Sequence, residues 1–283
     1  MLNIVTDTNV WYDAIGNDYV LNKIKSKGGM LCVTPINILE IVSKIDINNF
    51  EIRKKAAQSI IDNADRYLMS NEIYLARYWG FKVNDEVYWK NGVLTLSRAP
   101  SYNDLVNGYI DHIDKVTRKQ NLKLLKDWRE YHYKDYNKGV INGIQSIHSG
   151  YLERQSNGNL KKHKKIKTLF NINDKDIKES FFACYERAKM VLQEHKINPP
   201  ESPNKIMLTN AIPKIKNYVF AYMEYLRFLA TTPAKPDKND LGDLDLFLYL
   251  QNRNWLLATS DKRWIAIAKK VCPNNLLDLI NEK

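Results

Sequence analysis

The sequence predicts an α/β fold in which both ends of the chain contribute strands to one parallel sheet. Near the start, the β-branched segment 2–6 is followed by a helical pattern, an apolar segment at 30–34 and a second helical pattern. Near the end, the apolar segment 255–261 lies between two helical patterns. Because strands that alternate with helices are typical of parallel sheets, we expect the two ends to form one sheet.

The elements near the start follow from turn residues and from the spacing of apolar residues. The strand at 2–6 leads into Asp-Thr-Asn, which favours a turn, and a helix is then expected at about 10–27, where two glycines end it. MLCVT at 30–34 predicts a buried strand, and the proline after it suits the first turn of a helix. A long helix with Ala and Ile on one face is expected at about 49–69.

The rest of the chain divides into a helical middle segment and a second α/β part. The segment 85–217 is rich in Tyr, Lys and Asn and mostly helical in pattern, so we expect an inserted helical lobe there. The α/β domain would then consist of residues 1–84 and 218–283. In its second part we expect a helix at 241–254, a strand at 255–261 and a helix at 262–271.

The charge balance favours a polyanionic partner. The 283 residues include 43 Lys and Arg against 32 Asp and Glu, a formal net charge of +11, and such an excess attracts RNA, DNA or an anionic membrane surface. The three cysteines are far apart and form no CxxC pair, which argues against a disulfide framework or a zinc site. Because no apolar stretch reaches the roughly 18 residues that span a bilayer and no signal peptide is recognisable, we expect a cytoplasmic protein without a membrane partner.

Four carboxylates lie at the ends of predicted elements: Asp7, Glu40, Asp243 and Asp261. In an open parallel sheet, the carboxyl ends of strands and the adjacent helix starts line the functional crevice. Carboxylates that converge there repel one another unless a cation lies between them, and hard oxygen ligands suit Mg²⁺ or Mn²⁺. Each acid alone has an ordinary alternative, such as a helix cap, a solvated charge or a surface turn. Only the joint pattern predicts a metal site.

The blocks that contain these acids read, in chain order, IVTDTNVW, TPINILEI, GDLDLFLYLQ and LLATSDKRW. Together they resemble the PIN-domain nucleases, a family that includes the VapC-type toxins, over roughly residues 1–80 and 220–283. The resemblance implies a three-layer α/β/α sandwich with a central parallel sheet. The mainly α-helical insert is a difference from the family, because a compact PIN toxin has a much shorter connection there. It also implies an acidic pocket that binds Mg²⁺ or Mn²⁺ and hydrolyses phosphodiester bonds, most often in RNA.

The same resemblance assigns roles to individual residues. The catalytic and metal-binding acids are Asp7, Glu40, Asp243 and Asp261. The supporting polar positions are Thr6, Asn9, Thr259 and Ser260. The third acid is placed on Asp243 because it lies eighteen positions before Asp261, the separation expected from the helix and strand between them. Asp240 shares its helical face and is a further candidate metal ligand, whereas Asp245 is rotated by about 200° and should point elsewhere.

The insert contains the densest basic run of the chain, KKHKKIK. Such a run is either a solvated loop or a clamp on a nucleic-acid backbone. Its candidate nucleic-acid-binding residues are Lys161, Lys162, Lys164, Lys165 and Lys167. The segment 127–136 interleaves aromatic and basic residues, but its helical spacing favours core packing over base stacking.

These observations predict a Mg²⁺- or Mn²⁺-dependent endoribonuclease, a function compatible with a toxin or a defence effector. Its expected partner is RNA, and a protein inhibitor or antitoxin and a homodimer are also compatible with the resemblance. One alternative is a non-catalytic PIN-like protein that binds RNA or acts as a scaffold. A phosphatase of the haloacid dehalogenase type is a weaker alternative, because it would need a second Asp where the chain has Asn9.

Overall fold

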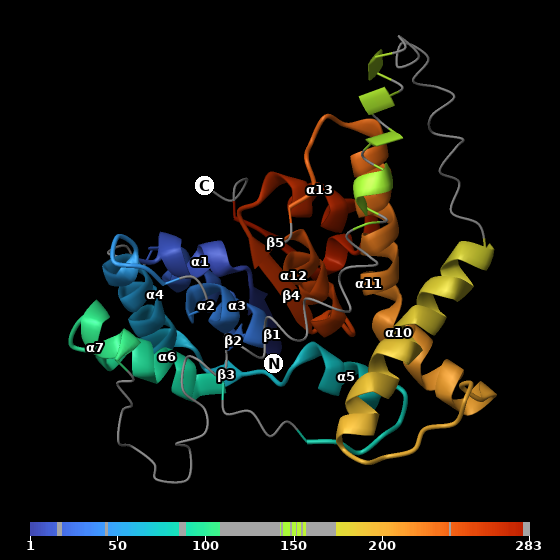
Figure 1. Cartoon of the computed structure of the whole chain (residues 1–283), viewed down its shortest axis with the longest axis horizontal. Coiled ribbons are helices and arrows are strands. Elements are labelled where there is room, and N and C mark those ends of the chain that lie inside the picture. The colour runs from blue at the N-terminus through green and yellow to red at the C-terminus, as the bar shows by residue number, and fades with distance from the viewer. Residues whose placement is uncertain are drawn as a thin grey trace.

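The computed structural model describes residues 1–15, 19–42, 45–84, 89–107, 174–237 and 239–279, together with short pieces between 142 and 156. These residues form an α/β structure around a five-stranded sheet in the order β3-β2-β1-β4-β5. All of its pairings are parallel, which confirms the predicted class (Figure 1). The strands are β1 (Leu2–Thr6), β2 (Gly29–Val33), β3 (Arg66–Tyr67), β4 (Trp255–Thr259) and β5 (Leu276–Asp278).

The described helices comprise seven before residue 108 and four after residue 173. The first group is α1 (Thr8–Asp13), α2 (Tyr19–Ser26), α3 (Pro35–Val42), α4 (Phe50–Asn63), α5 (Asn71–Tyr78), α6 (Trp89–Arg98) and α7 (Tyr102–Val106). The second group is α10 (Asp174–Glu194), α11 (Lys205–Thr231), α12 (Asp240–Asp245) and α13 (Lys262–Val271). Two 3-10 helices, Leu246–Tyr249 and Pro273–Asn275, follow α12 and α13.

Two hydrophobic clusters form the core, and residues that alternate along the strands belong to different clusters. Val5 and Leu257 pack with residues of α5, α10, α11 and α13, while Ile4 and Ala258 pack with residues of α1 to α4 and of α6. This division follows from the strand geometry, because successive side chains point to opposite faces of a sheet. Since both faces are covered, the strands read as continuous apolar runs.

The elements nearest the candidate acids follow the sequence expectation closely. The strands at 2–6 and 30–34 appear as β1 and β2, and the helix at 262–271 appears as α13. The segment 255–261 is a strand only up to Thr259, and Asp261 already caps α13. In each case a β-branched or leucine-rich run gives way to a residue that favours a turn or a cap, so local preference and packing agree.

Three other expectations were wrong. The helix expected at 10–27 is two helices, because α1 ends at Asp13, the chain turns at Ala14 and Ile15, and α2 begins only at Tyr19. The helix expected at 49–69 ends at Asn63 and is followed by β3. The helix expected at 241–254 ends at Asp245 and tightens into a 3-10 helix, whose four residues are buried. The strands β3 and β5 were not expected, because two and three residues are too few for a period to appear in the sequence.

The described helices of the expected insert pack into the same two clusters as the strands. On α6, Trp89 and Val93 join the cluster of Ile4, and α10 and α11 join the cluster of Val5. The expected boundary between 217 and 218 falls inside α11. In the described part of the chain, none of the helices has the length and apolar character needed to cross a membrane.

A buried asparagine joins the ends of β1 and β2. The side-chain oxygen of Asn37 accepts hydrogen bonds from the Thr34 backbone nitrogen at 2.8 Å and from its hydroxyl at 2.9 Å. Its amide nitrogen donates to the carbonyl oxygen of Thr6 at 2.9 Å and to the hydroxyl of Thr8 at 3.2 Å. Asn37 therefore connects the turn after β2 to the turn after β1, where Asp7 lies.

We predict that Asn37→Ala lowers the free energy of unfolding by about 2–3 kcal/mol, because it removes the side-chain bonds to three buried groups: the Thr34 backbone nitrogen, the Thr6 carbonyl oxygen and the Thr8 hydroxyl. The measurement is chemical denaturation followed by circular dichroism. Asn22→Ala on the exposed side of α2 is the control and should change stability by less than about 0.5 kcal/mol. Equal effects of the two variants would contradict a special role of the Asn37 network.

Candidate acidic site

Asp7 lies directly after the central strand of the sheet, where β1 meets β4. Its backbone nitrogen donates to the carbonyl oxygen of Ala258 at 3.0 Å, which continues the pairing of β1 with β4 by one residue. Its carboxylate caps α1 by accepting from the backbone nitrogen of Asn9 at 3.4 Å. Only 3% of Asp7 is exposed, so this carboxylate is held inside the protein.

Thr259, the last residue of β4, joins two of the acids. Its hydroxyl donates to the Asp7 carboxylate at 2.8 Å and accepts from the backbone nitrogen of Asp261 at 3.0 Å. Asp261 in turn caps α13 by accepting from the backbone nitrogen of Arg263 at 2.7 Å. One threonine therefore sets the positions of the acids that follow the two central strands.

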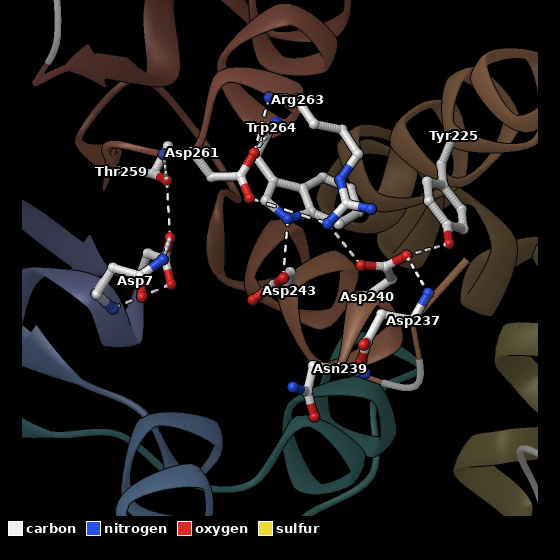
Figure 2. Close-up of polar contacts among 11 residues, drawn as sticks. Asp7, Tyr225, Asp237, Asn239, Asp240, Asp243, Thr259, Asp261, Arg263 and Trp264 are labelled. Atoms are coloured by element: carbon white, nitrogen blue, oxygen red, sulfur yellow. Dashed lines mark hydrogen bonds and ion pairs between the residues drawn. The ribbon is translucent and has the colours of Figure 1, made fainter. Parts of the chain in front are cut away.

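Asp243 approaches the same place from the short helix α12. Its carboxylate accepts a hydrogen bond of 2.8 Å from the indole nitrogen of Trp264, a buried residue of α13. Figure 2 shows the carboxylates of Asp7, Asp243 and Asp261 facing a common space between the ends of the strands and α12. The parallel sheet thus brings together acids that lie far apart in the sequence.

Burial and the neighbouring negative charges raise the pKa values of the Asp7 and Asp243 carboxyls. Burial raises the pKa of Asp7 above its ordinary value of 3.8, and the charge of Asp261 raises it further, while the bond from Thr259 lowers it. Burial also raises the pKa of Asp243 well above 3.8, and the charges of Asp7 and Glu40 add to that shift. In the described part of the chain, neither Asp7 nor Asp243 has a Lys or Arg as an ion-pair partner.

Glu40 lies on α3 and is half-buried. Its charge contributes to the raised pKa of Asp243 and also to that of the Tyr12 hydroxyl, for which burial is the main cause. The α3 helix begins at Pro35 directly after β2, so Glu40 reaches the acids from the strand on the other side of β1. All four acids that the sequence singled out therefore contribute to the electrostatics of the site.

Asp240 and Asp245 are held elsewhere on α12. The two carboxylate oxygens of Asp240 are occupied by the Tyr225 hydroxyl at 2.5 Å and by Arg263 at 2.6 Å, and Asp240 is 1% exposed. These bonds favour a structural role for Asp240 over metal binding. Asp245 pairs with Arg187 on another side of the helix, in agreement with the rotation of about 200° expected for residues two positions apart.

The supporting residues differ in what they contact. Asn9 and Thr259 both donate to the Asp7 carboxylate, at 3.5 and 2.8 Å. Thr6 is fully buried and donates to the carbonyl oxygen of Cys32 at 3.4 Å, so it joins β1 to β2 instead of contacting an acid. Ser260 is half-buried between Thr259 and Asp261.

Sequence reasoning missed Trp264, Asn37 and Arg263. Trp264 follows Asp261 by three residues, which places it at the end of the first turn of α13, but an indole in a helical pattern predicts only core packing. Its hydrogen bond to Asp243 depends on how α12 packs beside α13. The basic residues at 161–167 and the aromatic segment at 127–136 lie outside the described residues.

The donor chemistry of the site fits a hard divalent cation. Its oxygens come from carboxylates and hydroxyls, the ligand type that Mg²⁺ and Mn²⁺ prefer. Within the described ranges, no three Asp, Glu, His or Cys side chains converge closely enough to ligate one ion together. Because Mg²⁺ is usually held by one or two carboxylates and keeps several waters, Asp7 and Asp243 fit this mode of binding.

Comparisons with protein-family models, with curated proteins and with solved structures found no match to this chain. The functional argument therefore depends on the residues of the site and on their geometry.

We predict that Asp243→Asn stabilises the metal-free chain at neutral pH. A carboxyl whose pKa is raised in the folded state binds more protons there than in the unfolded chain, so its contribution to stability falls as pH rises from about 4 through the raised pKa. The neutral amide removes this loss, and we expect the melting temperature to rise by on the order of 2 °C at pH 7.

The measurement is thermal unfolding in the presence of a chelator at pH 7 and again below pH 4. The gain in melting temperature should vanish at the lower pH, because the Asp243 carboxyl of the native chain is then protonated in both the folded and the unfolded state. Glu201→Gln, at an exposed position, is the control and should leave the melting temperature unchanged. A lower melting temperature for Asp243→Asn at pH 7 would show that the ionised carboxylate is stabilised in the metal-free fold.

Proposed function

We propose that this chain is a metal-dependent nuclease and that it hydrolyses phosphodiester bonds in RNA as an endoribonuclease. The observation that carries the proposal is that Asp243 on α12 faces Asp7 at the end of β1 (Figure 2), close enough for the charge of Asp7 to raise the pKa of Asp243. Burial raises the pKa values of both carboxyls; the charge of Asp261 adds to the shift of Asp7, and the charges of Asp7 and Glu40 add to the shift of Asp243. Neither carboxyl has a cationic partner among the described residues. Buried negative charge without a cationic partner destabilises the fold, and a divalent cation bound between the two carboxylates would neutralise that charge.

The fold supports the same proposal. An all-parallel sheet with helices in two separate hydrophobic clusters agrees with the PIN-like three-layer α/β/α sandwich that the four sequence blocks imply. The net charge of +11 favours a polyanionic substrate. The resemblance of those blocks favours RNA among the polyanions.

In the proposed mechanism, Asp7 and Asp243 would hold Mg²⁺ or Mn²⁺, and Glu40 and Asp261 would contribute negative charge around it. A bound ion of this kind lowers the pKa of a water and offsets the charge that develops on the leaving oxygen of a phosphodiester. The protein residues keep the acids in place: Thr259 donates to Asp7 and Trp264 donates to Asp243. Both donors favour the ionised carboxylates, which is the form that a cation requires.

We predict that Asp7→Asn abolishes cleavage of RNA in the presence of Mg²⁺ or Mn²⁺, because the amide removes one of the two carboxylates that would hold the ion. The measurement is cleavage of a labelled structured RNA with each ion and with a chelator. Asp13→Asn on the exposed end of α1 is the matched control and should cleave like the native chain.

Three other results would contradict this function. Cleavage that persists in Asp7→Asn would remove the site from the mechanism. Metal-independent binding of RNA without cleavage by the native chain would favour a scaffold or RNA-binding protein. Release of phosphate from small phosphomonoesters, with no effect on RNA, would favour a phosphatase.

A further inference from the structure

The helix that carries Asp243 is held by a different partner at each of its three acids. Asp240 pairs with Arg263, Asp243 accepts from Trp264, and Asp245 pairs with Arg187. The helix α12 has only six residues, so its own backbone hydrogen bonds cannot stabilise it in isolation. Its orientation must therefore come from its side-chain contacts.

The contact at Asp245 is the most constrained of the three. Arg187, on α10, donates from Nη1 to Oδ1 and from Nη2 to Oδ2 of Asp245, both at 2.6 Å. Nη2 also lies 2.6 Å from Oε1 of Glu72 on α5, and the side-chain amide of Asn71 donates to Asp245 at 2.9 Å. Arg187 is 6% exposed and Asp245 is also 6% exposed, so the pair lies inside the protein.

This geometry is more specific than stability alone requires. A buried ion pair loses hydration on both sides and is often no more stabilising than apolar residues of the same volume, whereas fixing the register of packed elements is its best-attested use. The planar guanidinium bonded to both carboxylate oxygens fixes direction as well as distance. Because Asp245 and Asp243 lie two residues apart on one helix, any rotation of Asp245 about the axis moves Asp243 by the same angle.

We propose that Arg187 is a positioning residue for the acidic site, and that α10 uses it to set the rotation of α12 and hence the direction of the Asp243 carboxylate. This inference rests on the proposed metal-dependent function. It gives part of the segment 85–217 a defined task, since α10 belongs to that segment and reaches the site through this contact.

The test compares Mn²⁺ affinity in the full-length native chain with that in two Arg187 variants, by calorimetry well below the unfolding midpoint. Arg187→Lys keeps the charge and loses the two-pronged contact. A second variant combines Arg187→Gln with Asp245→Asn and Glu72→Gln, which replaces all three ions with neutral hydrogen-bonding groups and leaves no unpaired charge in the network. Tyr185→Phe on α10 is the control, because it removes only the bond from the Tyr185 hydroxyl to the Pro200 carbonyl oxygen.

We expect both Arg187 variants to bind Mn²⁺ about tenfold more weakly, in the range typical for residues that orient metal ligands, and Tyr185→Phe to bind like the native chain. Amide hydrogen exchange in the metal-free protein should be faster over residues 240–249 in the Arg187 variants only. Folded Arg187 variants with native Mn²⁺ affinity would overturn the positioning role while leaving the proposed function intact. Two results would overturn both the positioning role and the proposed function: a native chain that binds no Mn²⁺, or an Asp243→Asn variant that binds Mn²⁺ as tightly as the native chain.

Discussion

The parallel pairing of β1 with β4 is the contact on which the rest of the molecule depends. It joins segments so distant that the hydrogen bond from Thr259 to Asp7 spans 252 positions of sequence. Because the entropy cost of closing a loop grows only with the logarithm of its length, a long intervening segment adds little to the cost of this pairing. The register, with Thr6 opposite Ala258, then decides which side chains leave the sheet together.

The same pairing creates an electrostatic conflict that the core must offset. Asp7 and Asp261 leave adjacent strands, and Asp243 faces them from α12, so burial and neighbouring charge act together on Asp7 and Asp243. Two hydrophobic clusters on the sheet supply the opposing stabilisation. Proteins commonly accept such local instability where function needs it, which is why this place in the fold stands out from the other acidic residues.

The three acids of α12 show how far environment outweighs residue type. Asp240 has a hydroxyl and a guanidinium on its two oxygens, Asp245 has a guanidinium that bonds to both of its oxygens, and Asp243 has a single indole donor. Burial raises the pKa of Asp245 while Arg187 lowers it, whereas Asp243 has only the donor from Trp264 to oppose burial and the neighbouring charges. Among the three acids of α12, Asp243 is the one without a Lys or Arg partner in the described part of the chain.

Local sequence determined much of this arrangement before any contact was known. The apolar runs of β1, β2 and β4, and the polar residues that end them, were readable because strand and turn preferences act over a few neighbouring residues. That reasoning expected Asp7, Glu40, Asp243 and Asp261 at the carboxyl ends of parallel strands and the adjacent helix starts, and it pointed Asp245 away from the others. It failed for β3 and β5, which are too short to carry a period and form only because neighbouring strands offer free edges.

Only the tertiary structure decided which partner each acid meets. The bonds from Trp264 to Asp243, from Tyr225 to Asp240 and from Arg187 to Asp245 join residues 21, 15 and 58 positions apart. No spacing rule predicts them, because each depends on how two helices pack side by side on the sheet. The sequence by itself determined that Asp7 and Asp261 would follow strands of one parallel sheet, because strand and turn preferences are local. Packing decided which partner, among the described residues, each acid meets.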